Sequence, residues 1–146
     1  MIYLGADYAG YKLKESIKQY FDANKIKYID VGTDSDKNRN DFTEFIPPVV
    51  KNVKKDKSHM GILICGTGIG MVIGANRFRK IRAALVFSIK QAKSSKTHDN
   101  ANVLCLSSWE TDKQAANKIV SAWLKTKFKP LPRRVRRFKK VDSWPT

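Results

Sequence analysis

The sequence predicts an α/β protein in which a five-stranded parallel sheet is covered by helices on both faces. Short apolar runs alternate along the chain with longer stretches whose apolar residues recur at helical spacing. Residues 61–65 form a continuous apolar run, which is typical of a strand buried on both faces. A glycine-rich segment, residues 66–70, follows this strand directly and indicates a tight strand-to-helix turn.

The predicted elements alternate along the whole chain. Strands are expected over five short segments, 2–4, 28–31, 61–65, 81–87 and 103–106. Helices are expected around residues 13–21, 45–53, 71–77, 88–96 and 115–124, with a short basic helix over 133–140. This order favours a three-layer sandwich of the Rossmann or flavodoxin type. We expect a single domain over residues 1–146, with a basic C-terminal segment from about residue 128 to 146.

The charge of the chain indicates an anionic partner. Lys and Arg number 29 and Asp and Glu 13, so the formal net charge is +16 over 146 residues. An excess of this size attracts anions in general. Nucleic acid, an acidic membrane surface and a small phosphate ester all fit the charge alone.

Several classes are excluded by the composition. No apolar run approaches the roughly 18 residues of a transmembrane helix, and the N-terminus has no basic and apolar secretory pattern. Two cysteines cannot form a disulfide framework, and no Cys/His group has zinc spacing, so no zinc site is predicted. We expect a reduced, cytoplasmic protein without a membrane partner.

The segment Cys65-Gly66-Thr67-Gly68-Ile69-Gly70 is the main candidate site. Its glycines allow a tight turn that points successive N–H groups at one spot, a geometry suited to an anion. It is not a Walker loop, because no Gly-Lys-Ser/Thr follows. A dinucleotide fingerprint fails at Ile73, where a glycine is required, although Arg82 could serve a 2′-phosphate. A plain turn without a ligand is a further possibility.

The two cysteines differ in their surroundings. Cys65 ends a predicted strand beside the glycine loop, where backbone N–H groups and a helix N-terminus favour a thiolate. Such a group can act as nucleophile or general base, or the residue can simply be buried. Cys105 lies within an apolar strand and is expected to be a small buried residue.

Several motifs together resemble one enzyme family. The glycine segment is followed in order by Ala-Asn-Arg at 75–77, Ile-Arg-Ala-Ala at 81–84 and His-Asp-Asn-Ala-Asn-Val-Leu at 98–104. Gly-Ala-Asp at 5–7 and Leu-Lys-Glu at 13–15 precede it. Over about residues 1–140, this pattern resembles the ribose-5-phosphate isomerase B family, which includes galactose- and allose-6-phosphate isomerases.

The resemblance implies an activity and a set of site residues. Family members are homodimers that interconvert aldose and ketose phosphates without a metal or organic cofactor, at active sites between subunits. Whether dimers of this chain pair into tetramers stays open. The positions of Cys65 and Thr67 match the base and its neighbour, and His98 with Asp7 match the ring-opening pair. Met71 stands where a second subclass has a glutamate base, which indicates the cysteine subclass. Substrate-binding positions match Tyr8, Gly66, Gly68, Ile69, Gly70, Asp99, Asn100, Arg133 and Arg137.

Four positions depart from the family pattern. Tyr8 replaces a histidine that helps hold phosphate, and Phe42 replaces a tyrosine whose hydroxyl faces the sugar. Trp109 stands in place of an arginine near the phosphate, and Asp99 in place of an asparagine. The residues of proton transfer are retained, whereas the groups around the sugar and phosphate have changed.

The resemblance favours ribose 5-phosphate as the substrate, and a six-carbon phosphosugar, allose 6-phosphate or galactose 6-phosphate, is the alternative. Two other readings stay open. One is a non-catalytic relative, and the other is a nucleic-acid-binding module. Residues 125–140 hold nine Lys or Arg and no acid, with Phe128 and Phe138 between them. Because no nucleic-acid motif accompanies this run, a nucleic acid is not the expected partner.

Overall fold

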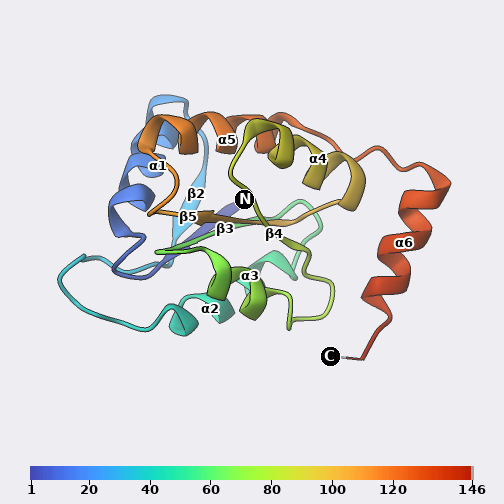
Figure 1. Cartoon of the computed structure of the whole chain (residues 1–146), viewed down its shortest axis with the longest axis horizontal. Coiled ribbons are helices and arrows are strands. Elements are labelled where there is room, and N and C mark those ends of the chain that lie inside the picture. The colour runs from blue at the N-terminus through green and yellow to red at the C-terminus, as the bar shows by residue number, and fades with distance from the viewer. Residues whose placement is uncertain (146) are drawn as a thin grey trace.

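Five parallel strands form one sheet in the order β2-β1-β3-β5-β4 in the computed structural model, which describes residues 1–145 (Figure 1). The strands are β1 (Ile2–Ala6), β2 (Tyr28–Asp30), β3 (Met60–Cys65), β4 (Ala83–Leu85) and β5 (Val103–Ser107). The helices are α1 (Tyr11–Ala23), α2 (Ile46–Val53), α3 (Ile69–Ala75), α4 (Ile89–Asp99), α5 (Lys113–Lys125) and α6 (Pro132–Asp142), with a 3₁₀ turn at Phe42–Glu44. The predicted three-layer class is confirmed.

The central strands β1, β3 and β5 are buried on both faces, as their apolar runs predict, whereas β2 and β4 at the edges are only partly buried. Helices α1, α4 and α5 cover one face of the sheet, and α2 and α3 cover the other (Figure 1). In β3 the side chains alternate between two cores: Ile62 and Ile64 pack with the first helix group, and Leu63 and Cys65 with the second. Cys65 is therefore anchored in the α2–α3 core at the end of its strand.

The strand order places the candidate site at a topological switch point. The connection from β1 runs to β2 on one side, whereas β3 lies on the other side of β1. Ligands of open α/β sheets bind beyond the carboxyl ends of strands at such a point. Relative to the flavodoxin order, the last two strands are exchanged, so β5 lies directly beside β3. Cys65 consequently pairs with Ser107.

Strand β4 is shorter than the predicted segment 81–87. The backbone N–H of Arg82 donates to Oδ1 of Asn102 at 2.8 Å, and that of Phe87 donates to Oε1 of Gln91 at 2.8 Å. Because side chains take these backbone groups at both ends, the regular strand is limited to Ala83–Leu85. Two helices also shift from their predicted ranges: α3 begins at Ile69, and α4 continues to Asp99.

Helix α6 lies beside the sandwich rather than in either layer. An extended segment after α5 carries the chain past α4 to α6 (Figure 1). None of the residues of α6 is buried. Within residues 1–145, no helix has both the length and the apolar character needed to cross a membrane.

Candidate active site

Cys65 lies at the end of β3 with its thiol against the glycine loop. The side chain is only 5% exposed. Its Sγ accepts a hydrogen bond from the backbone N–H of Gly68, with 3.1 Å between nitrogen and sulfur. Gly68 has a φ of +74°, and a Cβ there would lie 3.0 Å from the carbonyl of Leu106. Glycine is thus required at position 68 for the turn that aims this N–H at the sulfur.

The carbonyl groups of the loop are held by β5. Ser107 donates its hydroxyl to the carbonyl of Gly66 at 2.7 Å, and the N–H of Trp109 donates to the same oxygen at 3.1 Å. The N–H of Ser108 donates to the carbonyl of Cys65 at 3.0 Å. These bonds draw the carbonyls toward β5 and fix the conformation of the turn.

Three N–H groups of the loop make no hydrogen bond within the described residues. The N–H of Gly68 is used by Cys65, and that of Ile69 donates to Oγ1 of Thr67 at 3.2 Å. The three groups are those of Gly66, Thr67 and Gly70. Thr67 is exposed and Gly70 is half-buried, so a ligand can reach this part of the loop. An oxyanion can be bound there.

Asp7 lies at the neighbouring strand end. Ala6 pairs with Ile64 in the sheet, and the N–H of Asp7 donates to the carbonyl of Ile64 at 3.3 Å. The carboxylate accepts the N–H of Gly10 at 2.9 Å. Burial raises the pKa of the Asp7 carboxyl above its ordinary value, an effect that the bonds to backbone N–H groups oppose. The next residue, Tyr8, is anchored through its N–H, which donates to Oδ1 of Asn40 at 3.0 Å.

Two aromatic rings flank the loop. A Cβ at Gly66 would lie 2.6 Å from the indole of Trp109, and a Cβ at Gly70 would lie 2.7 Å from the ring of Phe42. Trp109 is 70% exposed although it covers Gly66. Both glycines are therefore needed because an aromatic ring occupies the space of a side chain. Trp109 and Phe42 are two of the four positions that depart from the family pattern, and they form the walls beside the donor groups.

His98 lies near the amino ends of the strands, at the edge of the sheet opposite the carboxyl end of β3, where Cys65 lies. It is in the last turn of α4, shortly before β5 begins at Val103, whereas Cys65 pairs with Ser107 at the end of β5. The length of β5, roughly 13 Å at about 3.3 Å per residue, separates these two edges. One copy of the chain does not bring His98 to Cys65.

Around His98 lies a hollow of about 390 Å³. It is lined by residues from α4, α6 and the segment before β4, among them His98, Asp99, Arg82, Arg134, Arg137 and Phe138. Arg133 does not line the hollow, whereas Arg134, which the sequence analysis did not select, does. Arg134 and Arg137 are three residues apart, so they lie on one helix face. This spacing is the sequence signal that could have identified Arg134.

Arg82 lies at this same edge, away from the glycine loop. Its Nε donates to the carbonyl of Asn100 at 2.9 Å, and Nη1 lies 2.9 Å from the carboxylate of Asp142. Asn100 ends α4 with a left-handed φ of +51°. The dinucleotide interpretation needs Arg82 beside the glycine loop, so the structure removes the support that Arg82 offered it.

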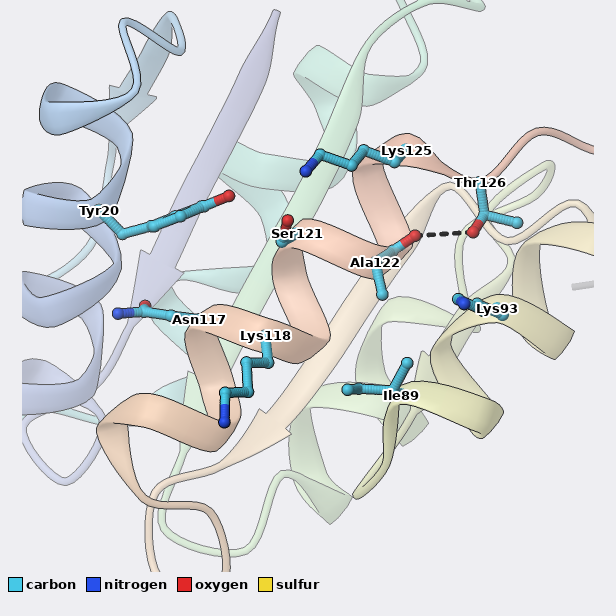
Figure 2. Close-up of a pocket in the computed structure, with 9 residues that line it drawn as sticks. All are labelled: Tyr20, Ile89, Lys93, Asn117, Lys118, Ser121, Ala122, Lys125 and Thr126. Atoms are coloured by element: carbon cyan, nitrogen blue, oxygen red, sulfur yellow. Dashed lines mark hydrogen bonds between the residues drawn. The ribbon is translucent and has the colours of Figure 1, made fainter.

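A larger hollow, of about 660 Å³, lies over α5 between α1 and α4 (Figure 2). Tyr20 reaches over it from α1, and Lys93 borders it on α4 (Figure 2). Lys118 and Lys125 come from α5, and the hydroxyl of Thr126 donates to the carbonyl of Ala122 at 2.7 Å (Figure 2). None of the predicted site residues lines this hollow.

Comparisons with known proteins agree with the resemblance. The family model described as Ribose/Galactose Isomerase matches residues 2–141. Ribose-5-phosphate isomerase B of Escherichia coli is 35% identical over 127 residues, which cover 87% of this chain and 85% of the relative. The solved ribose 5-phosphate isomerase of Thermotoga maritima superposes with a TM-score of 0.94 at 37% identity, covering 98% of this chain and 97% of the other.

One solved relative carries a ligand. Ribose-5-phosphate isomerase B of Mycoplasma genitalium, with bound ribulose-5-phosphate, superposes with a TM-score of 0.91 at 37% identity and covers 97% of this chain and 93% of its own. The chain therefore belongs to the ribose/galactose isomerase family. Its enzyme class is that of the family, the sugar-phosphate isomerases.

Proposed function

We propose that the protein interconverts ribose 5-phosphate and ribulose 5-phosphate with Cys65 as the base. The observation that carries this proposal is the contact of 3.1 Å between Sγ of Cys65 and the N–H of Gly68, in a loop with further N–H groups that make no hydrogen bond. The relative from Mycoplasma genitalium that was solved with ribulose-5-phosphate supports the choice of a five-carbon substrate.

The proton transfer follows from this arrangement. Cys65 takes the proton from C2 of the open-chain aldose, and the electron pair moves onto the carbonyl oxygen to give a cis-enediolate. The Cys65 thiol, whose proton exchanges with solvent, then protonates C1, and the hydroxyl proton of O2 moves to O1, so the ketose has the same atoms as the aldose. Acid–base assistance of this kind contributes roughly 10²–10⁴-fold.

The loop donors stabilise the intermediate. The N–H groups of Thr67 and Gly70 make no hydrogen bond within the described residues and can receive the enediolate oxygen. One well-placed donor to an oxyanion is worth about 3 kcal/mol in such reactions. Because the carbonyls of the loop are already held by β5, these donors need no rearrangement when charge develops.

We further propose that the working enzyme is a homodimer with each active site built from two copies. His98, which we assign to ring opening, lies at the edge opposite Cys65, so a second copy must supply it. The surface of α3 beside the loop favours such a contact, because Ile69 and Ile73, one helical turn apart, are 52% and 62% exposed. Arg137 lines the hollow around His98 and would bind the phosphate.

Asp7 and the aromatic walls complete the proposed site. Asp7 assists the opening of the furanose ring, and its burial favours the protonated form that can donate to an oxygen. Trp109 and Phe42 exclude water from the sides of the loop and offer apolar surface to the sugar carbons. Neither ring can hold a phosphate, so we assign phosphate binding to the arginines of α6.

A substrate panel tests the proposal. Ribose 5-, allose 6- and galactose 6-phosphate are each incubated with the protein in deuterated water, and proton NMR follows product formation and exchange at C2. We expect turnover and exchange with ribose 5-phosphate. Preference for a six-carbon sugar would overturn the substrate, and the absence of exchange with all three would overturn the isomerase assignment.

A further inference from the structure

We propose that Arg82 is a positioning residue that holds α6, with its arginines, against the end of α4 that carries His98. This inference rests on the proposed function, because it concerns the half of the site that binds phosphate and opens the ring. Arg82 is not proposed to touch the substrate. It acts through Arg134 and Arg137, which line the same hollow as His98.

The guanidinium joins two elements. Its Nε donates to the carbonyl of Asn100 at the end of α4, with a distance of 2.9 Å. Its Nη1 donates to both carboxylate oxygens of Asp142 in the last turn of α6, at 2.9 and 3.2 Å. The planar fork of arginine reaches both acceptors together, which the single ammonium of lysine cannot do.

An aromatic contact strengthens the connection. The Arg82 guanidinium carbon lies 5.2 Å from the centroid of the Phe138 ring, within cation–π range. Phe138 in turn packs edge-on against Phe128, with 5.5 Å between ring centroids. Phe138 and Asp142 are four residues apart, so both lie on the face of α6 that meets Arg82.

Helix α6 depends on this contact more than a core helix would. None of its residues is buried, and it lies beside the layers of the sandwich (Figure 1). The backbone of Arg82, by contrast, is fixed, because its N–H donates to Oδ1 of Asn102 next to β5. Arg82 therefore fixes α6 relative to the sheet, because the core does not hold this helix.

The ion pair also sets the charge of the hollow. Asp142 neutralises Arg82, and no ion pair within residues 1–145 involves Arg134 or Arg137. The two arginines of α6 are thus left with their charges for an anion. Without Asp142, the charge of Arg82 would repel them and move α6 away from His98.

Kinetics of Arg82→Gln test the proposal. We expect KM for ribose 5-phosphate to rise about tenfold or more, which corresponds to roughly 1.4 kcal/mol for lost charged hydrogen bonds, with kcat changed less than about threefold. Arg82→Lys, which keeps the charge but loses the fork, and Asp142→Asn, which removes the ion pair, should change KM in the same direction. Arg136→Gln is the matched control, since it removes one charge from α6 at a residue that does not line the hollow.

A double variant separates positioning from a merely structural role. If Arg82 acts through Arg137, then Arg82→Gln should add little to the rise in KM caused by Arg137→Gln. A KM of Arg82→Gln within about twofold of the unmodified protein, or full additivity of the two changes, would overturn the inference.

Limited proteolysis measures how firmly α6 is held, and this measurement does not depend on activity. Trypsin should cut α6 of Arg82→Gln faster than α6 of the unmodified protein or of Arg136→Gln. If the unmodified protein has no isomerase activity, the proposed function fails, whereas unchanged cutting of α6 counts against the role of Arg82 alone.

Discussion

The backbone N–H of Gly68 donates to Sγ of Cys65 across 3.1 Å, and this contact defines the chemical character of the site. It requires a left-handed glycine at position 68, with a φ of +74°. The same turn leaves the N–H groups of Thr67 and Gly70 available. One loop therefore supports the base and provides the donors for the oxyanion.

Replacement of Cys65 should remove the proton transfer and leave the fold intact. We expect Cys65→Ser and Cys65→Ala to lower kcat by about 10²–10⁴-fold or more, because general base assistance is lost. The measurement is exchange of the C2 proton with solvent, with thermal unfolding as the check on folding. Cys105→Ala is the matched control: Cys105 is fully buried in β5, burial raises its pKa, and its loss should leave kcat nearly unchanged.

Mixing two inactive variants tests whether each site needs two copies of the chain. Cys65→Ser and His98→Asn should each be inactive alone. After unfolding and refolding together in equal amounts, random pairing gives mixed dimers with one intact site each, so about a quarter of the full activity should return. Refolding each variant separately is the control, and a mixture that stays inactive while forming dimers would contradict the composite site.

Gly68→Ala should damage both the turn and the catalysis. A Cβ at this position strains the left-handed backbone and meets Leu85 Cδ1 at 2.6 Å, so we expect a loss of about 1–3 kcal/mol in the free energy of unfolding. The N–H would also move from Cys65, and kcat should fall. Urea unfolding and steady-state kinetics measure the two effects, with Gly74→Ala, which meets only the flexible end of Ile46, as the comparison.

The lowered pKa of Lys96 predicts that the free energy of unfolding rises with pH. Burial, with a smaller contribution from the charge of Arg82, lowers the pKa of Lys96 to about 8. The unfolded chain, with an ordinary lysine pKa of about 10.4, binds more protons than the folded chain between these values. The free energy of unfolding should therefore increase as pH rises from about 8 toward 10.4.

Urea unfolding across this pH range checks the prediction. In Lys96→Met the increase should be smaller by an amount on the order of 1–3 kcal/mol, since the partly buried ammonium is gone. Lys93→Met, a change of an exposed lysine on the same helix, should keep the increase. An equal pH dependence in all three proteins would show that Lys96 is not responsible.

The sequence predicted most of the elements but not their ends. Strand β3 was clear because burial on both faces produces a continuous apolar run. The ends of β4 were wrong by two residues on each side, because the side chains of Asn102 and Gln91 take its flanking N–H groups. The choice between Arg133 and Arg134 depends on how α6 rotates against α4, which the arginine spacing alone does not determine.

What the sequence by itself determined is the local chemistry: alternating strands and helices, a glycine turn, and Cys65 at a strand end beside it. These features depend on residues that are neighbours in the chain. Only the tertiary structure decided that β5 lies beside β3, that Cys65 and His98 lie at opposite edges, and that Arg82 binds Asp142. Those relationships join residues tens of positions apart, and packing of the whole sheet is what brings them together or keeps them apart.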